Sequence, residues 1–358
     1  MNNAKRWCIG VLAVTLALLL CVGALNAWTD PFFHYRAPRP GLSYHNDSDV
    51  YMNDGLLRNT EYEAVLIGSS ETMNFRASEC EALFGYRVLK VPHANARNRE
   101  IYDDLQAGFR THGELKAVFF GLDYDNLLTD KDLMLAESVA PDYLRDDRLL
   151  NDINYLLNRD VLLNYTLPTL MDTARGRDEP DWDDYLVWSE DESFGDSAYR
   201  YAMTEPLPEQ EGLTEQERQT VQENIDQNIL SLAREHPETQ FYVFVTPYSI
   251  AKLYTIGVQG NLLKDMEAER EAAQLLLTQP NIRYFSFLAD FETICDLDNY
   301  IDAVHYGPWI NSKMLRCMKA GEYELRPETL AAYFERISSF YLSYDYQTNG
   351  GQEGNDAF

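Results

Sequence analysis

The stretch that decides the fold is Glu63-Ala64-Val65-Leu66-Ile67-Gly68-Ser69-Ser70-Glu71-Thr72. Its first half is a continuous apolar run, which is typical of a strand buried on both faces of a parallel sheet. Gly68 then permits a sharp turn, because it has no Cβ atom to clash. Two interpretations of the serines are open. Ser69 and Ser70 cap a helix, a common use of serine, or one of them presents a hydroxyl at the carboxyl end of a strand, where open α/β sheets bind ligands.

The composition fits one large domain or two ordinary ones. The chain has 358 residues, of which 45% are hydrophobic, and its formal net charge is −28. We expect no nucleic-acid partner, because binding to nucleic acid requires clustered Lys and Arg. The five cysteines show no CxxC motif and no metal-type spacing, so we predict neither a metal site nor another cofactor. A disulfide between Cys295 and Cys317 is conceivable but is not what we expect.

An apolar segment, residues 7–27, follows Lys5 and Arg6 in a short N-terminal end, residues 1–6. As a helix this segment would be about 31 Å long, enough to cross the hydrocarbon core of a bilayer. Basic residues before such a helix keep that end cytoplasmic, so we expect a single-pass anchor in the cell membrane and an extracytoplasmic main domain. The competing interpretation is a signal peptide cleaved after Ala24, which also places the main domain outside the cytoplasm.

Strand and helix patterns alternate after an irregular juxtamembrane segment, residues 28–59. Such alternation predicts βαβ units and an α/β fold across residues 60–346, with a flavodoxin-like parallel five-stranded sheet between helices. The final residues, 347–358, are expected to be a flexible tail. The predicted strands are residues 63–68, 86–91, 116–123, 241–247 and 281–288. The predicted helices are residues 69–83, 100–110, 214–236, 262–278, 308–319 and 327–343.

The alternation breaks at about residues 131–208, which we interpret as a helical insertion. Helical patterns at residues 148–158 and 161–173 are followed by an acidic segment with Trp and Tyr. Two interpretations stay open: a lid or substrate platform beside the sheet, and a plain helical appendage. The alternation resumes at Thr214, which forms a capping box with Glu217 and so starts the next helix.

Two of the six histidines, His93 and His305, follow predicted strands and therefore share the carboxyl edge of the sheet with Ser70. Asp302 precedes His305 by three residues, so one loop turn would let its carboxylate orient the imidazole while the other ring nitrogen faces the cleft. This is the arrangement in which a histidine takes the proton of a serine nucleophile. His93 is interpreted as a loop histidine satisfied by its neighbours, or alternatively as a substrate contact. The other four lie near the membrane or at the opposite edge: His34, His45, His112 and His236.

These motifs resemble those of the SGNH (GDSL-type) hydrolase superfamily. Gly68-Ser69-Ser70-Glu71 stands where that superfamily has its Gly-Asp-Ser-Leu block, and Asp302-Ala303-Val304-His305 stands where it has Asp-x-x-His. The resemblance covers roughly residues 60–130 and 214–320. It implies that Ser70 is the nucleophile, Asp302 the orienting acid and His305 the base of a catalytic triad.

One membrane-anchored branch of this superfamily includes the proteins of lipoteichoic-acid D-alanylation and alginate O-acetylation. The chain resembles this branch in its N-terminal anchor, its Gly-Ser-Ser sequence and its helical insertion. This resemblance implies an extracytoplasmic serine esterase or O-acyltransferase acting on a cell-envelope polysaccharide or polyol polymer. It makes a multispanning membrane acyltransferase a plausible partner. The alternative, from a different class, is a non-catalytic membrane-anchored envelope scaffold or glycan-binding protein with a degenerate SGNH site.

The chain departs from the family pattern at the oxyanion hole. Members often place Gly in a second block and Asn in a third, whereas here the loop at residues 93–98 lacks Gly and Asp123 occupies the Asn position. An ionised Asp accepts hydrogen bonds and donates none. The hole would then depend on the backbone N–H of Ser70 and a further donor, which leaves room for a slow transferase or a degenerate enzyme. The oxyanion or substrate candidates are Ser69, Asn95, Arg97, Asn98 and Asp123.

Several other residues have both a structural and a functional interpretation. Asp123 and Asp125 lack a third ligand at metal-site spacing, so no metal is expected there. Glu71 is interpreted as a negative charge that stabilises the N-terminus of a helix through the helix dipole, rather than as a catalytic acid. The tryptophans that either stack on sugar rings or pack in the core are Trp182, Trp188 and Trp309.

Overall fold

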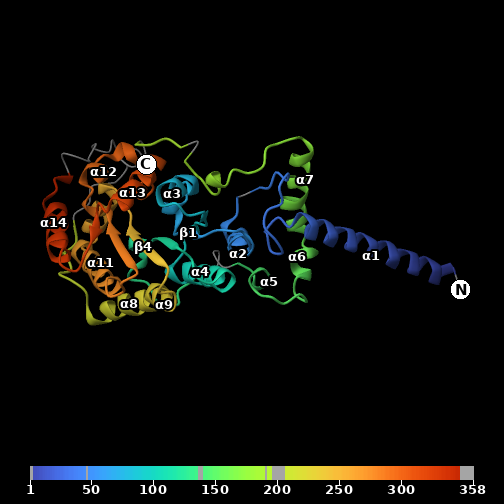
Figure 1. Ribbon diagram of the computed structural model, residues 1–358, viewed down its shortest axis with the longest axis horizontal. Helices are drawn as coiled ribbons and strands as arrows, with labels where there is room; N and C mark the ends of the chain where they lie inside the picture. The colour runs from blue at the N-terminus through green and yellow to red at the C-terminus, as the bar shows by residue number, and fades with distance from the viewer. Residues whose placement is uncertain (1–2, 46, 136–139, 190–191, 196–205, 347–358) are drawn as a thin grey trace.

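A six-stranded sheet forms the centre of the folded domain (Figure 1). The computed structural model describes residues 3–45, 47–135, 140–189, 192–195 and 206–346. Within these residues the strand order is β2-β1-β3-β4-β5-β6. The strands are β1 (Ala64–Ile67), β2 (Val88–Lys90), β3 (Ala117–Gly121), β4 (Gln240–Val245), β5 (Ile282–Ser286) and β6 (Glu324–Leu325).

The first five strands are parallel and have the flavodoxin-like order that the sequence predicts. The predicted number of five strands is wrong, because β6 pairs antiparallel with the edge strand β5. β6 has two residues, too few to show an alternating pattern in the sequence. The predicted tail, residues 347–358, lies outside the described residues.

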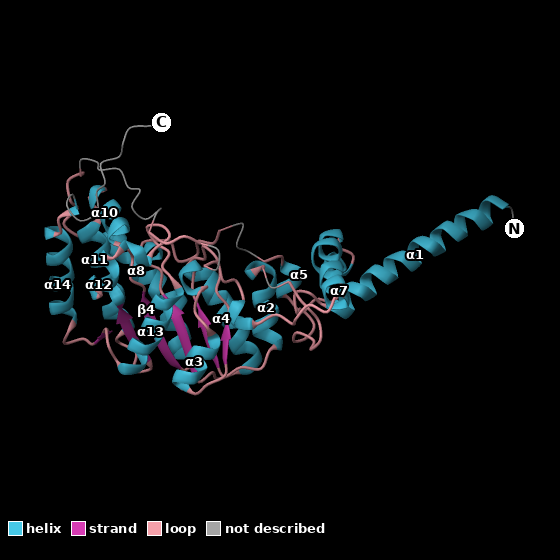
Figure 2. Cartoon of the chain, turned by 90° about the horizontal axis from the view of Figure 1, so that it is seen from above, coloured by secondary structure: helices cyan, strands magenta, loops and turns pink. Residues whose placement is uncertain are grey.

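Helices cover both faces of the sheet (Figure 2), which explains why β1 and β3 have no polar side chain. Every residue of β1 and β3 is buried. These two strands pair from Ala64 with Ala117 to Ile67 with Phe120, so both end at the same edge. The main helices of the domain are α3 (Ala77–Phe84), α4 (Asn98–His112), α8 (Glu215–Ile225), α10 (Ile250–Val258), α11 (Leu262–Leu276), α13 (Pro308–Ala320) and α14 (Leu330–Ser343).

Two helices begin where local signals in the sequence predict. Thr214 caps α8: its Oγ1 accepts the N–H of Glu217 at 3.3 Å, and the Glu217 carboxylate accepts the N–H of Thr214 at 2.8 Å. α8 continues through the π-helical residues η6 (Asp226–Leu230) into α9 (Ser231–Glu235), so the run predicted at residues 214–236 is helical throughout. α13 has Pro308 in its first turn, where a missing N–H costs nothing.

Several predicted boundaries are wrong. The helix predicted at residues 69–83 is instead a 3₁₀ turn, η1 (Ser70–Thr72), followed by α3 from Ala77 onward. The juxtamembrane segment predicted to be irregular contains α2 (Asp49–Asn59), which buries Met52 and Leu56 against the domain. The segment between the predicted strand at residues 281–288 and the predicted helix at residues 308–319 contains two elements that were not predicted, α12 (Phe291–Cys295) and the 3₁₀ turn η8 (Leu297–Asn299). These short elements are held by tertiary packing, which local periodicity does not encode.

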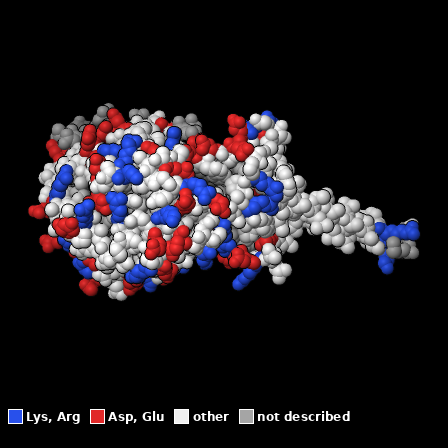
Figure 3. Space-filling model, viewed as in Figure 1, with Lys and Arg blue, Asp and Glu red and all other residues white. Residues whose placement is uncertain are grey.

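A long helix, α1 (Asn3–Thr29), extends from the domain (Figure 1). It is long and apolar enough to cross a membrane, with a mean hydropathy of 2.7 in its most apolar window. Residues 7–29 have no charged side chain. Figure 3 accordingly shows an uncharged shaft between the basic tip and the domain, whose visible surface mixes both signs of charge.

The helical elements of the insertion are α5 (Asp142–Arg145), α6 (Ile153–Leu156), the π-helical η4 (Val161–Thr166), α7 (Leu167–Ala174) and the 3₁₀ turn η5 (Trp182–Asp184). Two of them, α6 and η4, lie against α1 (Figure 1), whereas α5 contacts α2 and η5 contacts α3. Asn26 of α1 donates through Nδ2 to the carbonyl of Leu156 at 2.9 Å and accepts from Thr166 Oγ1 at 2.8 Å. Neither open interpretation covers the whole insertion. α6 and η4 pack on α1, whereas Trp188 reaches the domain and contacts Ser70.

Candidate active site

Ser70 stands three residues after β1, at the start of the η1 turn. The chain can make this turn because Gly68 and Gly121 leave room for the methyl group of Thr72. A Cβ atom at either glycine would lie 2.5 Å from Thr72 Cγ2. Gly68 is therefore required by close approach, since its φ is not in the left-handed region. The two strand ends and η1 pack as one unit that holds Ser70 at the carboxyl edge of the sheet.

His305 and Asp302 share one tight loop that follows the last parallel strand. An antiparallel bridge between Tyr300 and Tyr306 closes this loop. The Asp302 carboxylate accepts the backbone N–H groups of Val304 and His305 through Oδ1, both at 2.7 Å, and lies 2.7 Å from His305 Nδ1 through Oδ2. Burial raises the pKa of Asp302, but these hydrogen bonds outweigh it and hold the pKa below 3.8. Asp302 is therefore an ionised acceptor at neutral pH.

The other ring nitrogen, His305 Nε2, lies 2.8 Å from Ser70 Oγ. Because Nδ1–H donates to the Asp302 carboxylate, a neutral ring presents the Nε2 lone pair to the serine hydroxyl. Two buried contacts fix this approach: Tyr306 Oη donates to the carbonyl of Glu71 at 2.9 Å, and Asn311 Nδ2 donates to the same oxygen at 3.2 Å. The loop of His305 and the turn of Ser70 are thus tied together directly.

Ser70 and His305 open onto a pocket of about 430 Å³ at the carboxyl edge of the sheet. This volume is in the range of small-molecule sites. The wall of this pocket is acidic. The pocket is lined by Ser70, Glu71, Asn95, Asp123, Asp125, Tyr248, Asp302, Ala303, Val304 and His305.

Two further carboxyl groups lie in this wall with raised pKa values. Glu71 is buried and accepts from Thr246 Oγ1 at 2.5 Å, and burial together with the charge of Asp123 raises its pKa well above 4.5. Asp123 accepts from Tyr248 Oη at 2.6 Å through Oδ1. Burial nevertheless raises the pKa of Asp123, and the charge of Asp125 adds to it. Asp123, which occupies the Asn position of the family pattern, therefore binds a proton more readily than an ordinary Asp.

The structure separates the predicted oxyanion and substrate candidates. Asn95, in a left-handed conformation with φ 55°, and Asp123 line the pocket. Ser69 is buried and lies outside the pocket lining, with its carbonyl accepting from Thr72. Arg97 turns away to donate to Asn126 Oδ1 at 2.6 Å. Asn98 is buried and donates to Asn224 at 3.1 Å, between α4 and α8.

Trp188 is a site residue for which the sequence left the role open. Its Nε1–H donates to the carbonyl of Ser70 at 3.2 Å, and its ring stands edge-on to the His305 imidazole with 5.3 Å between centroids. Trp182 instead packs against Phe33, and Trp309 is hydrogen-bonded to Asn299 at 2.9 Å. The spacing of the tryptophans contains no signal that distinguishes these three roles.

His93 lies at the predicted edge but is buried and outside the pocket lining. Its Nδ1 lies 3.1 Å from Asp104 Oδ2, and this interaction raises the pKa of His93 to about 9 against the opposing effect of burial. Glu71 does not face a helix dipole as predicted, because it lies in a three-residue 3₁₀ turn. Within the described residues no three His, Cys, Asp or Glu side chains are grouped as metal ligands, and all five cysteines are free thiols.

No protein-family model matches the chain, and no curated protein matches it in sequence. Among solved structures it is similar to a protein provisionally described as a platelet activating factor from Streptococcus pneumonia. The match has 12% sequence identity and a TM-score of 0.36, and it covers 76% of this chain and 91% of that chain. The function is therefore argued from the geometry of the pocket.

Proposed function

We propose that the protein is an extracytoplasmic serine esterase or O-acyltransferase that acts on a cell-envelope polysaccharide or polyol polymer. The observation that carries the proposal is the hydrogen-bonded series Ser70–His305–Asp302, with distances of 2.8 Å and 2.7 Å. Both lie within the reach of about 3.2 Å that proton transfer requires. A non-catalytic scaffold has no need of this geometry, so the distances support an enzyme over that alternative.

The first step of the proposed reaction forms an acyl-enzyme. Ser70 Oγ attacks the carbonyl carbon of an acyl ester while His305 Nε2 takes the hydroxyl proton. The ionised Asp302 stabilises the imidazolium that results. The tetrahedral intermediate collapses when its C–O bond to the alcohol breaks, and His305 returns the proton to that leaving oxygen.

The second step releases the acyl group. Water, or a hydroxyl group of the polymer, attacks the ester carbon on Ser70 as His305 accepts its proton. The bond to Ser70 Oγ then breaks, and His305 returns the proton to the serine. Water gives hydrolysis and a polymer hydroxyl gives O-acylation, so the same residues serve both reactions.

The oxyanion of each intermediate requires hydrogen-bond donors aimed into the pocket. We assign this role to the backbone N–H of Ser70 and to the amide of Asn95, which lies on the pocket wall. Asp123 becomes a donor when its carboxyl group is protonated, and its raised pKa favours that form.

The proposed location follows from α1. The charge bias of Lys5 and Arg6 supports a cytoplasmic N-terminus, and α1 then carries the domain to the outer side of the cell membrane. A multispanning membrane acyltransferase is the proposed partner, because a transferase on that side needs an activated acyl group delivered across the membrane.

A fluorophosphonate probe tests the nucleophile directly. The purified full-length chain should be labelled on Ser70, and Ser70→Ala should abolish the labelling while leaving the thermal unfolding midpoint unchanged. Ser69→Ala is the matched control, because this adjacent serine lies outside the pocket lining and should leave labelling intact. A folded wild-type chain that is never labelled, and that shows no acyl-enzyme by mass spectrometry, would overturn the proposal.

Mass spectrometry of cell-envelope polymers tests the direction of the reaction. Cells with Ser70→Ala should lack an acyl ester if the enzyme is a transferase, and should accumulate one if it is an esterase. Identical ester content in wild-type, Ser70→Ala and Ser69→Ala cells would show that the envelope polymer is not the substrate.

A further inference from the structure

The insertion exposes several large apolar side chains within one stretch of the chain. Leu149 and Leu150 are 80% and 94% exposed, at the loop that leads into α6. Exposed apolar side chains continue along the helical run that follows. We call this surface the insertion face and define it by Leu149, Leu150, Ile153, Leu163 and Met171.

The opposite side of the same helical run is buried in the protein. Tyr155, Thr166 and Thr169 have almost no exposed surface, and Tyr155 stacks on Phe32 with 5.6 Å between ring centroids. The run from α6 to α7 therefore packs one side on the juxtamembrane segment and exposes Ile153, Leu163 and Met171, beside the polar Asn154 and Asn164, on the rest of its surface. Large apolar side chains that stay exposed within one short segment mark an interaction surface for an apolar partner.

The position of the insertion face indicates which partner this is. α6 and η4 pack on α1 near its C-terminal end, and α7 continues from η4 (Figure 1). Leu156 and Leu157 border Gly23 of α1, so the helical run packs directly on the apolar helix. Trp28, exposed at the last turn of α1, is of the residue type enriched at membrane–water boundaries.

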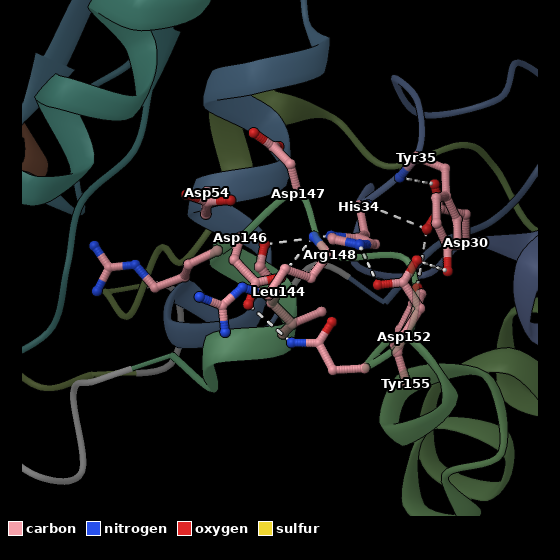
Figure 4. Close-up of polar contacts among 12 residues, drawn as sticks. Asp30, His34, Tyr35, Asp54, Leu144, Asp146, Asp147, Arg148, Asp152 and Tyr155 are labelled. Atoms are coloured by element: carbon pink, nitrogen blue, oxygen red, sulfur yellow. Dashed lines mark hydrogen bonds and ion pairs between the residues drawn. The ribbon is translucent and has the colours of Figure 1, made fainter.

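The junction between α1 and the insertion is fixed by buried hydrogen bonds (Figure 4). Asp30, in a left-handed conformation with φ 48°, accepts from the N–H of Tyr35 at 2.9 Å and from Tyr155 Oη at 3.0 Å. Tyr35 Oη donates in turn to Asp152 at 3.0 Å. The insertion therefore has a set orientation relative to α1 and lies where α1 joins the domain.

The five side chains of the insertion face are uncharged, so their attraction to a partner is apolar. Arg175 and Arg177, near the end of α7, both pair with Asp172, and Arg159 lies beside Asp160. Cations that are paired with acids in this way do not form a basic patch for anionic lipids. Side chains such as Leu150 and Ile153 gain free energy by leaving water for the acyl boundary, whatever the headgroup charge.

We propose that the insertion face lies in the headgroup–acyl boundary of the bilayer that α1 crosses. The chain is then held by one spanning helix and one interfacial helical run, which together set the tilt and height of the domain over the membrane. The proposal rests on α1 being inserted in the membrane, but it does not depend on the chemistry at Ser70.

The test uses the full-length chain in lipid nanodiscs, at one copy per disc. Leu150→Cys and Leu163→Cys are each labelled with a nitrobenzoxadiazole fluorophore, in a background with Cys8, Cys21 and Cys295 replaced by Ser. The matched control is Leu342→Cys, another exposed leucine (54%), on α14 at the end of the molecule farthest from α1 (Figures 1 and 2). Lipids with a nitroxide on the acyl chain serve as the quencher.

We expect blue-shifted emission and several-fold stronger nitroxide quenching at positions 150 and 163 than at position 342. Emission and quenching equal to those at position 342 would show that the insertion face stays in water and would overturn the proposal. Blue-shifted emission without nitroxide quenching would show that protein rather than lipid covers the face, and would overturn it as well.

Discussion

At the scale of single residues, the carboxylate of Asp302 decides which nitrogen of His305 faces the serine. It holds Nδ1 at 2.7 Å and leaves Nε2 pointing at Ser70 Oγ. Asp302→Asn keeps the shape of this side chain but removes its charge, and allows its amide to face the ring with the wrong hydrogen-bonding group. We expect kcat to fall roughly 10²–10⁴-fold with little change in KM. The measurement is hydrolysis of a chromogenic acyl ester, and an unchanged kcat would exclude Asp302 from the mechanism.

Asp123 should make the reaction sensitive to alkali. Its carboxyl group donates to an oxyanion only while protonated, and burial raises its pKa above that of an ordinary Asp. Glu71, Asp125 and Tyr248 face it in the wall, and Lys252 approaches through its ion pair with Asp125 at 2.6 Å. We therefore expect kcat/KM to fall as the pH rises through the pKa of Asp123. Asp123→Asn supplies a permanent donor and should remove this fall.

Asp125→Asn is the control for that profile. It removes a negative charge that raises the pKa of Asp123. The fall in kcat/KM should therefore move to lower pH in Asp125→Asn, whereas it should vanish in Asp123→Asn. The same pH profile in wild type and Asp123→Asn would show that Asp123 is not a donor in the reaction.

At the scale of elements, the packing of η1 against β1 and β3 depends on one methyl group. A Cβ atom at Gly121 would lie 2.5 Å from Thr72 Cγ2, and its next contact, with Phe244, is an ordinary 3.5 Å. Gly121→Ala should therefore lower the free energy of unfolding by about 1–3 kcal/mol through overpacking. Adding Thr72→Ser removes the methyl group and should restore most of the loss. Chemical denaturation of the single and double variants measures this coupling.

Substitutions at Gly68 and Gly257 serve as comparisons for the rescue of Gly121→Ala by Thr72→Ser. At Gly68 a Cβ atom would also lie 3.0 Å from the backbone oxygen of Gly121, so Thr72→Ser should rescue Gly68→Ala only in part. Gly257 in α10 has open space around it, so Gly257→Ala should leave stability unchanged or raise it by up to about 1 kcal/mol. Full rescue at Gly68, or none at Gly121, would contradict the assigned role of the Thr72 methyl group.

Elements with strong local signals were predictable from the sequence. β1 and β3 are apolar runs that end in turns, and α8 has a capping box that the structure contains. The turn at Ser70 was not predictable, because residues 69–83 have an acceptable helical composition and only packing of Thr72 between two glycines selects a 3₁₀ turn. α2 was missed for the same reason, since its stability comes from the surfaces that it covers.

At the scale of the whole molecule, the pocket joins residues that are far apart in sequence. Ser70 and His305 meet across 235 residues because both follow parallel strands, whose carboxyl ends share one edge. Topology therefore made that juxtaposition predictable. Trp188 reaches the same pocket from the insertion, which lacks strand–helix alternation, so no rule of topology placed it there.

Buried titratable groups should make the stability of the whole molecule fall as the pH rises. Glu269 of α11 is fully buried and accepts from Tyr284 Oη at 3.1 Å, and burial raises its pKa to about 7. In the unfolded chain its pKa is near 4.5. The stabilisation that comes from its bound proton is therefore complete below pH 4.5 and is lost as the pH rises through 7.

His93 extends the same trend to higher pH. It keeps its proton in the folded state up to about pH 9, against 6.5 when unfolded, so its contribution is complete below pH 6.5 and is lost as the pH rises through 9. We expect the free energy of unfolding to decline from pH 5 to pH 9. Glu269→Gln should flatten the decline between pH 4.5 and pH 7 and leave the part above pH 7, because its amide does not titrate. Denaturation at a series of pH values measures both windows, and an equal decline below pH 7 in the two proteins would show that Glu269 does not hold its proton in the folded state.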